Sequence, residues 1–126
     1  MGYRSEVVFA VSKPMVPHFL TVLAQHPDVR QLVHEADQFE KNYIDGGMLM
    51  YWSGIKWYDS YPEIAAIKSF VADCESESLA SWADTSNPYT EYEHFRFVRI
   101  GEETDDIEEK GGFGDGEIHI SRSVHF

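Results

Sequence analysis

Five short stretches of the chain have the alternation or the length of β-strands: residues 3–12, 39–44, 48–52, 94–100 and 117–126. A period of two places successive side chains on opposite faces of a strand. The first stretch is apolar on both faces at its centre, which predicts an interior strand. The last stretch has an apolar face, interrupted by Arg122, and a polar face, which predicts an edge strand with one solvated side.

Two helical regions separate these strands. The first begins at Pro17, because proline is tolerated in the first turn of a helix. Pro27 removes a hydrogen-bond donor and clashes with the preceding turn, so we expect one kinked helix or two short ones, with Asp28 capping the second segment. The second region begins at Ser60, where Ser60 and Glu63 have the spacing of a capping box. It carries an apolar stripe that we expect to lie on the sheet: Ile64, Ile67, Phe70, Val71 and Cys74.

The order of these elements, β-α-β-β-α-β-β, predicts the fold class. With a hairpin signal at Asp45-Gly46-Gly47 and right-handed crossovers, the first six elements match an α+β, ferredoxin-like β-α-β-β-α-β sandwich. We expect a single domain over residues 1–126, with an antiparallel sheet, two helices on one face and an extra C-terminal strand. Residues 75–91 are expected to form a surface connection, and residues 101–116 a long acidic loop.

The composition of the 126-residue chain is that of a folded domain, with 43% apolar and 14% aromatic residues. Its N-terminus lacks the apolar region and cleavage site of a signal peptide, and no apolar run approaches the roughly 20 residues that cross a bilayer. The single cysteine cannot form an internal disulfide. We therefore expect a cytoplasmic protein that does not contact a membrane.

The net charge of the chain says most about its possible partners. The formal net charge is −12, of which residues 1–63 carry −3 and residues 64–126 carry −9. Phosphate binding needs clustered Lys and Arg, so direct contact with nucleic acid is not expected. A basic protein partner, a cation or solubility alone would each suit so acidic a chain.

The densest group of acids lies in the predicted loop after Gly101. An oxygen-rich chain with several glycines suits a hard cation such as Ca²⁺, but the spacing does not match a calcium-binding loop. A solvated, self-repelling loop and an acidic patch that binds a protein are the other interpretations, and we prefer the patch to the metal site. The acids assigned to this patch are Glu102, Glu103, Asp105, Asp106, Glu108 and Glu109.

Two further groups of side chains are candidates for binding. Trp57, Tyr58 and Tyr61 form an aromatic turn, which is either the end of the core or a contact site for a partner, because aromatic side chains with polar tips are favoured at interfaces. Arg4 and Arg122 lie on or beside predicted strands, where each forms a structural ion pair or binds an anionic ligand. Since Arg122 interrupts an apolar face, it must be paired if it is buried.

Motifs for catalysis are missing from the sequence. It contains no nucleophile motif, no phosphate-binding glycine loop and no zinc-ligand spacing. Three of the six histidines recur every eight residues, at His18, His26 and His34, and we expect ordinary surface or core roles for all of them. We therefore assign no catalytic residue, no metal site and no cofactor, and we favour a non-enzymatic protein over an enzyme.

Four stretches carry a resemblance: MGYRS followed by EVV at the start, IKWYDSYPEI at 55–64, FVRIGEETDDI at 97–107 and ISRSVHF at 120–126. Through them the chain resembles a group of small uncharacterised bacteriophage and prophage proteins that begin with MGYRS. The match covers nearly the whole chain. The resemblance implies phage origin and expression in a bacterial cytoplasm, and it carries over no catalytic residue.

Three functions follow as hypotheses. The first is an accessory protein that binds a host defence or nucleic-acid enzyme at a basic surface and inhibits it by competing with phosphates. The second is a small-ligand or metal-dependent enzyme, which would need a pocket that joins Arg4, Arg122 and the acids after Gly101. The third is a structural or assembly protein of the phage particle. A homodimer through an uncovered sheet face would be compatible with each of them.

Overall fold

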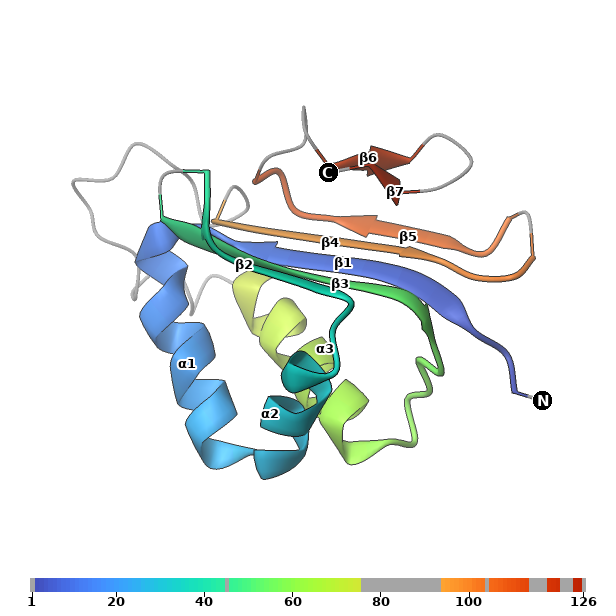
Figure 1. Ribbon diagram of the computed structural model, residues 1–126, viewed down its shortest axis with the longest axis horizontal. Coiled ribbons are helices and arrows are strands. Elements are labelled where there is room, and N and C mark those ends of the chain that lie inside the picture. The colour runs from blue at the N-terminus through green and yellow to red at the C-terminus, as the bar shows by residue number, and fades with distance from the viewer. Residues whose placement is uncertain are drawn as a thin grey trace.

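The computed structural model describes residues 2–44, 46–75, 94–103, 105–113, 118–120 and 124–125 (Figure 1). Within these residues the protein has an α+β fold, in which three α-helices cover one face of a five-stranded antiparallel sheet. The elements follow the chain in the order β1 (Ser5–Val11), the 3-10 helix η1 (Lys13–Met15), α1 (Val16–Gln25), α2 (Pro27–His34), β2 (Gln38–Tyr43), β3 (Gly47–Ile55), α3 (Pro62–Glu75), β4 (Phe95–Ile100), β5 (Ile107–Lys110), β6 (His119–Ile120) and β7 (Val124–His125).

The strands of the main sheet are arranged in the order β2-β3-β1-β4-β5. β1 lies at the centre, as its two apolar faces predict. Phe9 of β1 lies opposite Met50 of β3 on one side and opposite Phe97 of β4 on the other. A strand that is apolar on both faces is stable where both faces are covered, and this accounts for the central position. The pairing of β2 with β3 confirms the hairpin predicted between them.

The larger core lies between the sheet and the helices. Phe9 is fully buried there, and its ring centroid lies 5.4 Å from that of Phe19 in α1 and 6.1 Å from that of Phe70 in α3. Ile64 and Ile67 of α3 are also buried, which confirms the apolar stripe predicted for this helix. The helices are therefore held on the sheet by side chains whose spacing was readable in the sequence.

The opposite face of the sheet has a smaller core of its own. Val8, Leu49 and Val98 are fully buried and cluster with the buried side chains of Phe113 and Ile118, on the side where β6 and β7 lie (Figure 1). The face through which we expected a homodimer is therefore covered at its centre. A homodimer stays a prediction, but it would need a different surface.

Two predictions about the C-terminal third are wrong. Residues 107–110, assigned to a loop, form β5, in which Glu108 lies opposite Arg99 of β4. The acidic composition hid this strand, because its charges are compensated by partners on the neighbouring strand. Since β5 occupies the edge beside β4, the described residues within 117–126 do not add an edge strand to the main sheet. Instead, β6 and β7 form a separate two-stranded sheet.

The first helical region consists of two helices, α1 and α2, divided at Pro27 as predicted. The prediction that Asp28 caps the second segment is wrong. The N-cap residue of α2 is His26, which has an extended backbone (φ −129°, ψ 91°) and makes no side-chain cap hydrogen bond. Asp28 lies in the first turn of α2, where its negative charge faces the positive end of the helix dipole.

Some predictions lie beyond what the structure describes. Residues 76–93, which include most of the expected surface connection, and the position of Arg122 lie outside the described residues, as does the side chain of Cys74. The role assigned to Arg122 therefore stays a prediction. Among the described helices, none combines the length and the apolar content that crossing a bilayer requires.

Candidate functional site

The connection between β4 and β5 is a turn that carries four of the predicted acids, Glu102, Glu103, Asp105 and Asp106, and we call it the acidic turn. The amide of Gly101 donates to the backbone oxygen of Asp106 at 2.7 Å. The amide of Asp106 donates to the backbone oxygen of Glu103 at 3.1 Å. These backbone bonds define the shape of the turn. The acids thus lie on a short hydrogen-bonded turn before β5 instead of in the long loop that we predicted.

Tyr3, which precedes β1, connects the acidic turn to the start of the chain. Its hydroxyl donates to Asp106 Oδ2 at 2.7 Å and accepts from the Glu103 amide at 2.9 Å. One side chain therefore holds two points of the turn, although it lies 103 positions before Asp106. Tyr3 was not among the predicted site residues, because no local pattern marks a residue as the partner of so distant a turn.

Half of the predicted acidic patch is paired with arginines of β4. Arg99 donates to Asp106 and also to Glu108, the latter at 2.8 Å. Arg96 donates to Glu109 at 3.1 Å. Both arginine side chains are only 11% exposed, so these pairs lie at the boundary of the core. The three paired acids therefore contribute less negative charge to the surface than we predicted from the sequence.

The pairing with Arg99 also changes the ionisation of Asp106. The hydrogen bond from Arg99, reinforced by that from Tyr3, lowers the pKa of the Asp106 carboxyl below its usual range. Asp106 is consequently ionised at neutral pH, and its role is to hold the turn. General acid–base catalysis needs a pKa near the working pH, so Asp106 is unsuited to it.

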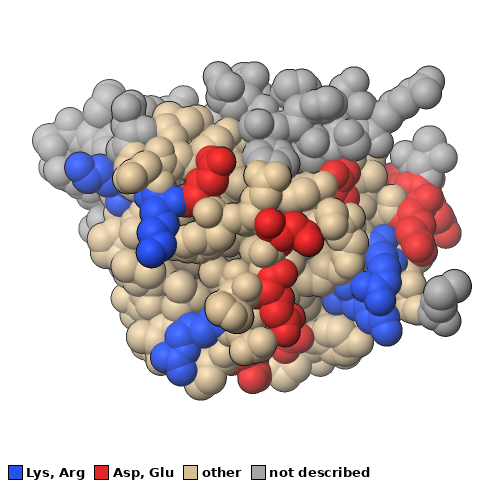
Figure 2. Space-filling model, viewed as in Figure 1, with Lys and Arg blue, Asp and Glu red and all other residues tan. Residues whose placement is uncertain are grey.

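The other three acids of the acidic turn are exposed. Glu102, Glu103 and Asp105 form no ion pair with any side chain that the structure describes. Figure 2 shows acidic side chains gathered at the end of the molecule where β4 turns into β5 in Figure 1. No ion pair with a described residue compensates these three carboxylates. They are the part of the predicted patch that can attract a cationic group.

The aromatic turn divides between the core and the surface. Trp57 is buried, and its ring centroid lies 6.0 Å from that of Trp52 and 5.7 Å from that of Phe97. Tyr58 and Tyr61 are half-buried, and their ring centroids lie 5.2 Å apart. Trp57 therefore belongs to the end of the core, and the two tyrosines are the members of this turn that a partner can reach.

An open hollow of about 370 Å³ brings the aromatic turn and the acidic turn together. We call it the tyrosine hollow after Tyr3 and Tyr58, which border it together with Asp106. Lys68 and Asp59 also line it, and they form an ion pair of 2.7 Å. Segments far apart in the sequence thus meet at one surface, which periodicity along the chain could not predict.

Arg4 does not line the tyrosine hollow. Its guanidinium donates to the backbone oxygen of Gly54 at 3.1 Å and forms no ion pair with the described residues. It borders a second hollow, of about 390 Å³, whose acids are Glu35, Asp37 and Glu63. The pocket that the enzyme hypothesis requires, with Arg4 beside the acidic turn, is therefore not formed by the described part of the chain.

In the part of the chain that the structure describes, no three His, Cys, Asp or Glu side chains are arranged to hold a metal ion. Comparison of the chain with protein-family models, with curated proteins and with solved structures finds no match. Function must therefore be inferred from the site itself and not from a relative.

Proposed function

We propose that the chain is a non-enzymatic binding module that contacts a basic surface of another protein through the acidic turn and the tyrosines beside it. The observation that carries the proposal is the exposure of Glu102, Glu103 and Asp105 on a turn that Tyr3 holds by two hydrogen bonds. Charges held in place lose less freedom on binding than charges on a mobile loop. Tyr58 adds amphipathic surface of the kind enriched at interfaces.

The net charge supports the same kind of partner. A chain of −12 attracts a cationic surface before contact and accelerates association. Arg96 and Arg99 compensate the acids that they pair with, and they leave the three exposed acids uncompensated. Because salt screens charges at an exposed surface, the complex is expected to weaken as the ionic strength rises.

The phage origin implied by the resemblance makes a bacterial host protein the proposed partner. A host defence or nucleic-acid enzyme has a basic surface that binds phosphates, and carboxylates can occupy such a surface in their place. In this proposal the chain inhibits its target in the bacterial cytoplasm.

The ferredoxin-like assignment of the fold is also part of the proposal. It is supported by the path from β1 through the helices to β2, which runs parallel to β1 with the antiparallel β3 between them. The third helix and the strand β5 beside β4 are additions to that plan.

Neutralising the exposed acids tests the proposed contact. A variant with Glu102→Gln, Glu103→Gln and Asp105→Asn removes three charges and leaves Asp106 with its partners. In affinity purification from bacterial lysate, the wild-type chain is expected to retain a basic protein at about 50 mM NaCl and to release it at about 500 mM. The variant is expected to retain about tenfold less of that protein.

A matched control removes the same kinds and number of charges elsewhere, by Asp28→Asn, Glu35→Gln and Glu40→Gln, all at exposed positions. This control is expected to retain the partner as the wild type does. An equal loss in both variants would mean that net charge acts without a defined site. If no salt-sensitive basic partner is retained at all, the proposed function is wrong.

A further inference from the structure

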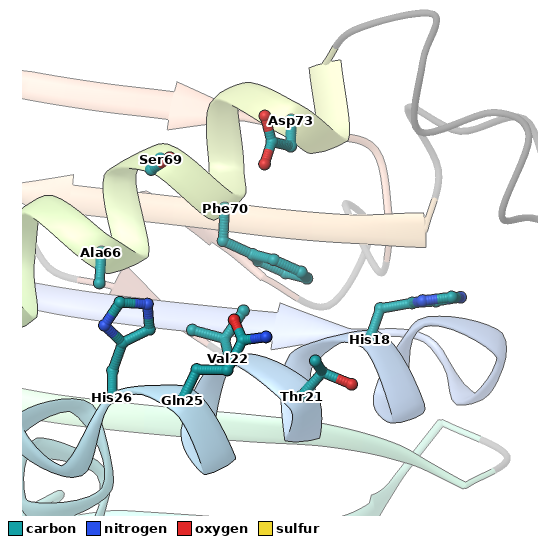
Figure 3. Close-up of a pocket in the computed structure, with 9 residues that line it drawn as sticks. All are labelled: His18, Thr21, Val22, Gln25, His26, Ala66, Ser69, Phe70 and Asp73. Carbon is teal, nitrogen blue, oxygen red and sulfur yellow. The ribbon is translucent and has the colours of Figure 1, made fainter.

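Two hollows border different parts of α3. The hollow toward α1, of about 540 Å³, is lined by this helix from Ala66 to Asp73, and its described lining residues include neither Lys nor Arg (Figure 3). The second, of about 390 Å³, lies at the start of α3 and is the hollow that Arg4 borders. It combines side chains of both charge signs with an apolar floor, and we call it the mixed-charge hollow. Its volume falls within the range of pockets that hold small organic ligands.

The floor of the mixed-charge hollow is held in place by the fold. Trp52 of β3, Leu32 of α2 and Ile64 of α3 line the hollow, and all three are buried. The indole N–H of Trp52 donates to the backbone oxygen of Leu32 at 3.0 Å, which ties α2 to the sheet. The polar atom of Trp52 is thus satisfied within the fold. The apolar body of a ligand can lie on this packed surface without rearrangement of the core.

Gly54 leaves open space beside this floor. It lines the hollow two positions after Trp52 in β3, and a period of two places both residues on the same face of the strand. A Cβ atom at Gly54 would have no neighbour within 4 Å. The strand therefore fills none of this space with a side chain, and the space is left to a ligand.

The charges of the hollow are separated by sign. Lys56 follows the end of β3, and Arg4 donates to the backbone oxygen of Gly54 at 3.1 Å, so the two cations lie at the end of this strand. Glu35 follows α2, and Glu63 lies in the first turn of α3. Both acids also line a neighbouring hollow that neither cation borders. None of these four side chains forms an ion pair with a described residue.

A third acid of the hollow, Asp37, is already used by the fold. Its carboxylate accepts from the backbone amide of Ser53 at 2.7 Å and from the hydroxyl of Ser53 at 3.1 Å. It thereby fixes the connection after α2 to β3. The groups that a ligand can engage are therefore the cations at the strand end and the two glutamates at the helix ends.

This separation of charge selects a zwitterion. A simple anion or cation would meet one end of the hollow and be repelled by the other. A molecule with a carboxylate and an ammonium group at its two ends would be matched at both, and partial burial strengthens each attraction relative to bulk water. Because such a molecule has no net charge, the overall charge of −12 neither attracts nor repels it.

We propose that the mixed-charge hollow binds a short apolar peptide with free termini. The terminal carboxylate lies at Arg4 and Lys56, where a guanidinium can donate two parallel hydrogen bonds. The terminal ammonium lies at Glu35 and Glu63, and the apolar side chains lie on the floor. At least one peptide unit separates the two termini, as charges at two ends of a hollow require.

Four peptides with the same apolar body test this site: leucyl-leucine, its amide, its N-acetyl form and the N-acetyl amide. Each is titrated into the isotopically labelled chain, and backbone amide shifts are followed by NMR. Leucyl-leucine is expected to give saturable shifts at the ends of β3 and α2 and at the start of α3. Its affinity is expected to exceed that of either singly blocked form by about threefold or more.

The same series separates the proposed site from general attraction to an acidic chain. If the cationic amide binds as tightly as leucyl-leucine, net charge accounts for the binding and the proposal is wrong. Equal binding of the doubly blocked peptide would show that neither terminus is recognised, and it would also overturn the proposal. So would the absence of saturable shifts around the hollow.

Substitution of the cations assigns the carboxylate. Arg4→Met combined with Lys56→Met is expected to lower the affinity for leucyl-leucine to about that for its amide in the wild type, and to leave the affinity for the amide unchanged. Arg30→Met combined with Lys41→Met removes the same two charges at exposed positions outside the hollow. This control is expected to bind all four peptides as the wild type does. An equal loss in both double variants would contradict a defined carboxylate site.

Substitution of the acids assigns the ammonium group. Glu35→Gln combined with Glu63→Gln is expected to lower the affinity for leucyl-leucine to about that for its N-acetyl form, whose own affinity should not change. The control is Glu40→Gln combined with Glu102→Gln, at exposed positions outside the hollow. Full binding of leucyl-leucine by the first variant would show that its ammonium group is not held by these glutamates.

A last pair of variants tests the hollow itself. Gly54→Trp places a large side chain in the open space and is expected to abolish binding of leucyl-leucine. Ala65→Trp, at an exposed position of α3 outside the lining, is expected to leave binding unchanged. Retained binding by Gly54→Trp would place the peptide elsewhere. The mixed-charge hollow shares no lining residue with the tyrosine hollow, and no partner protein is needed for these titrations, so this proposal and the proposed function can fail separately.

Discussion

Arg99 determines how much of the predicted negative charge reaches the surface. Its guanidinium donates to Asp106, to Glu108 and, at 3.0 Å, to the hydroxyl of Ser5. Without it, the carboxylates of Asp106 and Glu108 would share one region with no cation between them, and like charges so placed repel each other. Arg99 therefore gives Asp106 and Glu108 a structural role, and it leaves other acids of the predicted patch available to a partner.

We expect Arg99→Met to lower the free energy of unfolding by about 1 to 2 kcal/mol at pH 7. The substitution removes charged hydrogen bonds, and the magnitude stays modest because both carboxylates are 32% exposed and can be solvated. The pKa of Asp106 is lower in the folded state than in the unfolded state. The pairing of Asp106 therefore stabilises the fold fully at pH values above the unfolded pKa of about 4, and this stabilisation is lost as the pH falls through the lower folded pKa. The wild type and the variant should therefore converge in acid, as measured by urea denaturation over a pH series.

The matched control is Lys68→Met, which breaks the ion pair with Asp59. Those side chains are 39% and 76% exposed, so we expect a change within about 0.5 kcal/mol. Equal effects of the two substitutions would show that burial adds nothing to the Arg99 pairs.

The strand β5 depends on backbone geometry as well as on charge. Gly111, which follows β5, has a φ of +83°, and a Cβ at this position would collide with the backbone oxygen of Phe95. The backbone oxygen of Gly111 also accepts a hydrogen bond of 2.8 Å from Arg96. The chain passes close to the start of β4 here, and only glycine permits both the conformation and the approach.

We expect Gly111→Ala to lower the free energy of unfolding by about 2 kcal/mol or more, because the left-handed conformation and the collision with Phe95 both oppose a side chain. Urea denaturation monitored by circular dichroism measures the change.

Gly54→Ala in β3 is the control for this substitution. A Cβ at Gly54 would have no neighbour within 4 Å, so stability should be unchanged or raised by up to about 1 kcal/mol. A tolerated Gly111→Ala would mean that β5 does not need this close approach.

At the scale of elements, local patterns predicted most of the helices and strands. The division at Pro27, the hairpin before β3, the apolar stripe of α3 and the central position of β1 are all set by residues near one another in the chain. β5 could not be predicted in this way. Three of its four residues, Glu108, Glu109 and Lys110, are charged, and the strand is held by its pairing with β4, where Arg99 lies opposite Glu108 and Arg96 forms an ion pair with Glu109.

For the molecule as a whole, the net charge of −12 makes self-repulsion a general term in stability. We expect the melting temperature at pH 7 to rise by about 3 °C between about 10 mM and about 200 mM NaCl, because salt screens this repulsion. Differential scanning calorimetry at the two salt concentrations measures this change in melting temperature.

The same salt series near the isoelectric point of about 4.7 is the control, since the net charge is small there and the effect should vanish. A melting temperature that falls with salt at pH 7 would show that attractive ion pairs outweigh the general repulsion.

The amino-acid sequence by itself determined the helical and strand periods, the interior position of β1 in the sheet and the excess of acidic over basic residues. Each of these depends on residue type or on neighbours within a few positions. Only the tertiary structure decided which acids Arg96 and Arg99 compensate, that Trp57 lies in the core, and that Tyr3 holds the acidic turn. The physical reason is that these contacts join residues far apart in the chain. Whether such residues meet depends on the register and order of the strands, which no local pattern encodes.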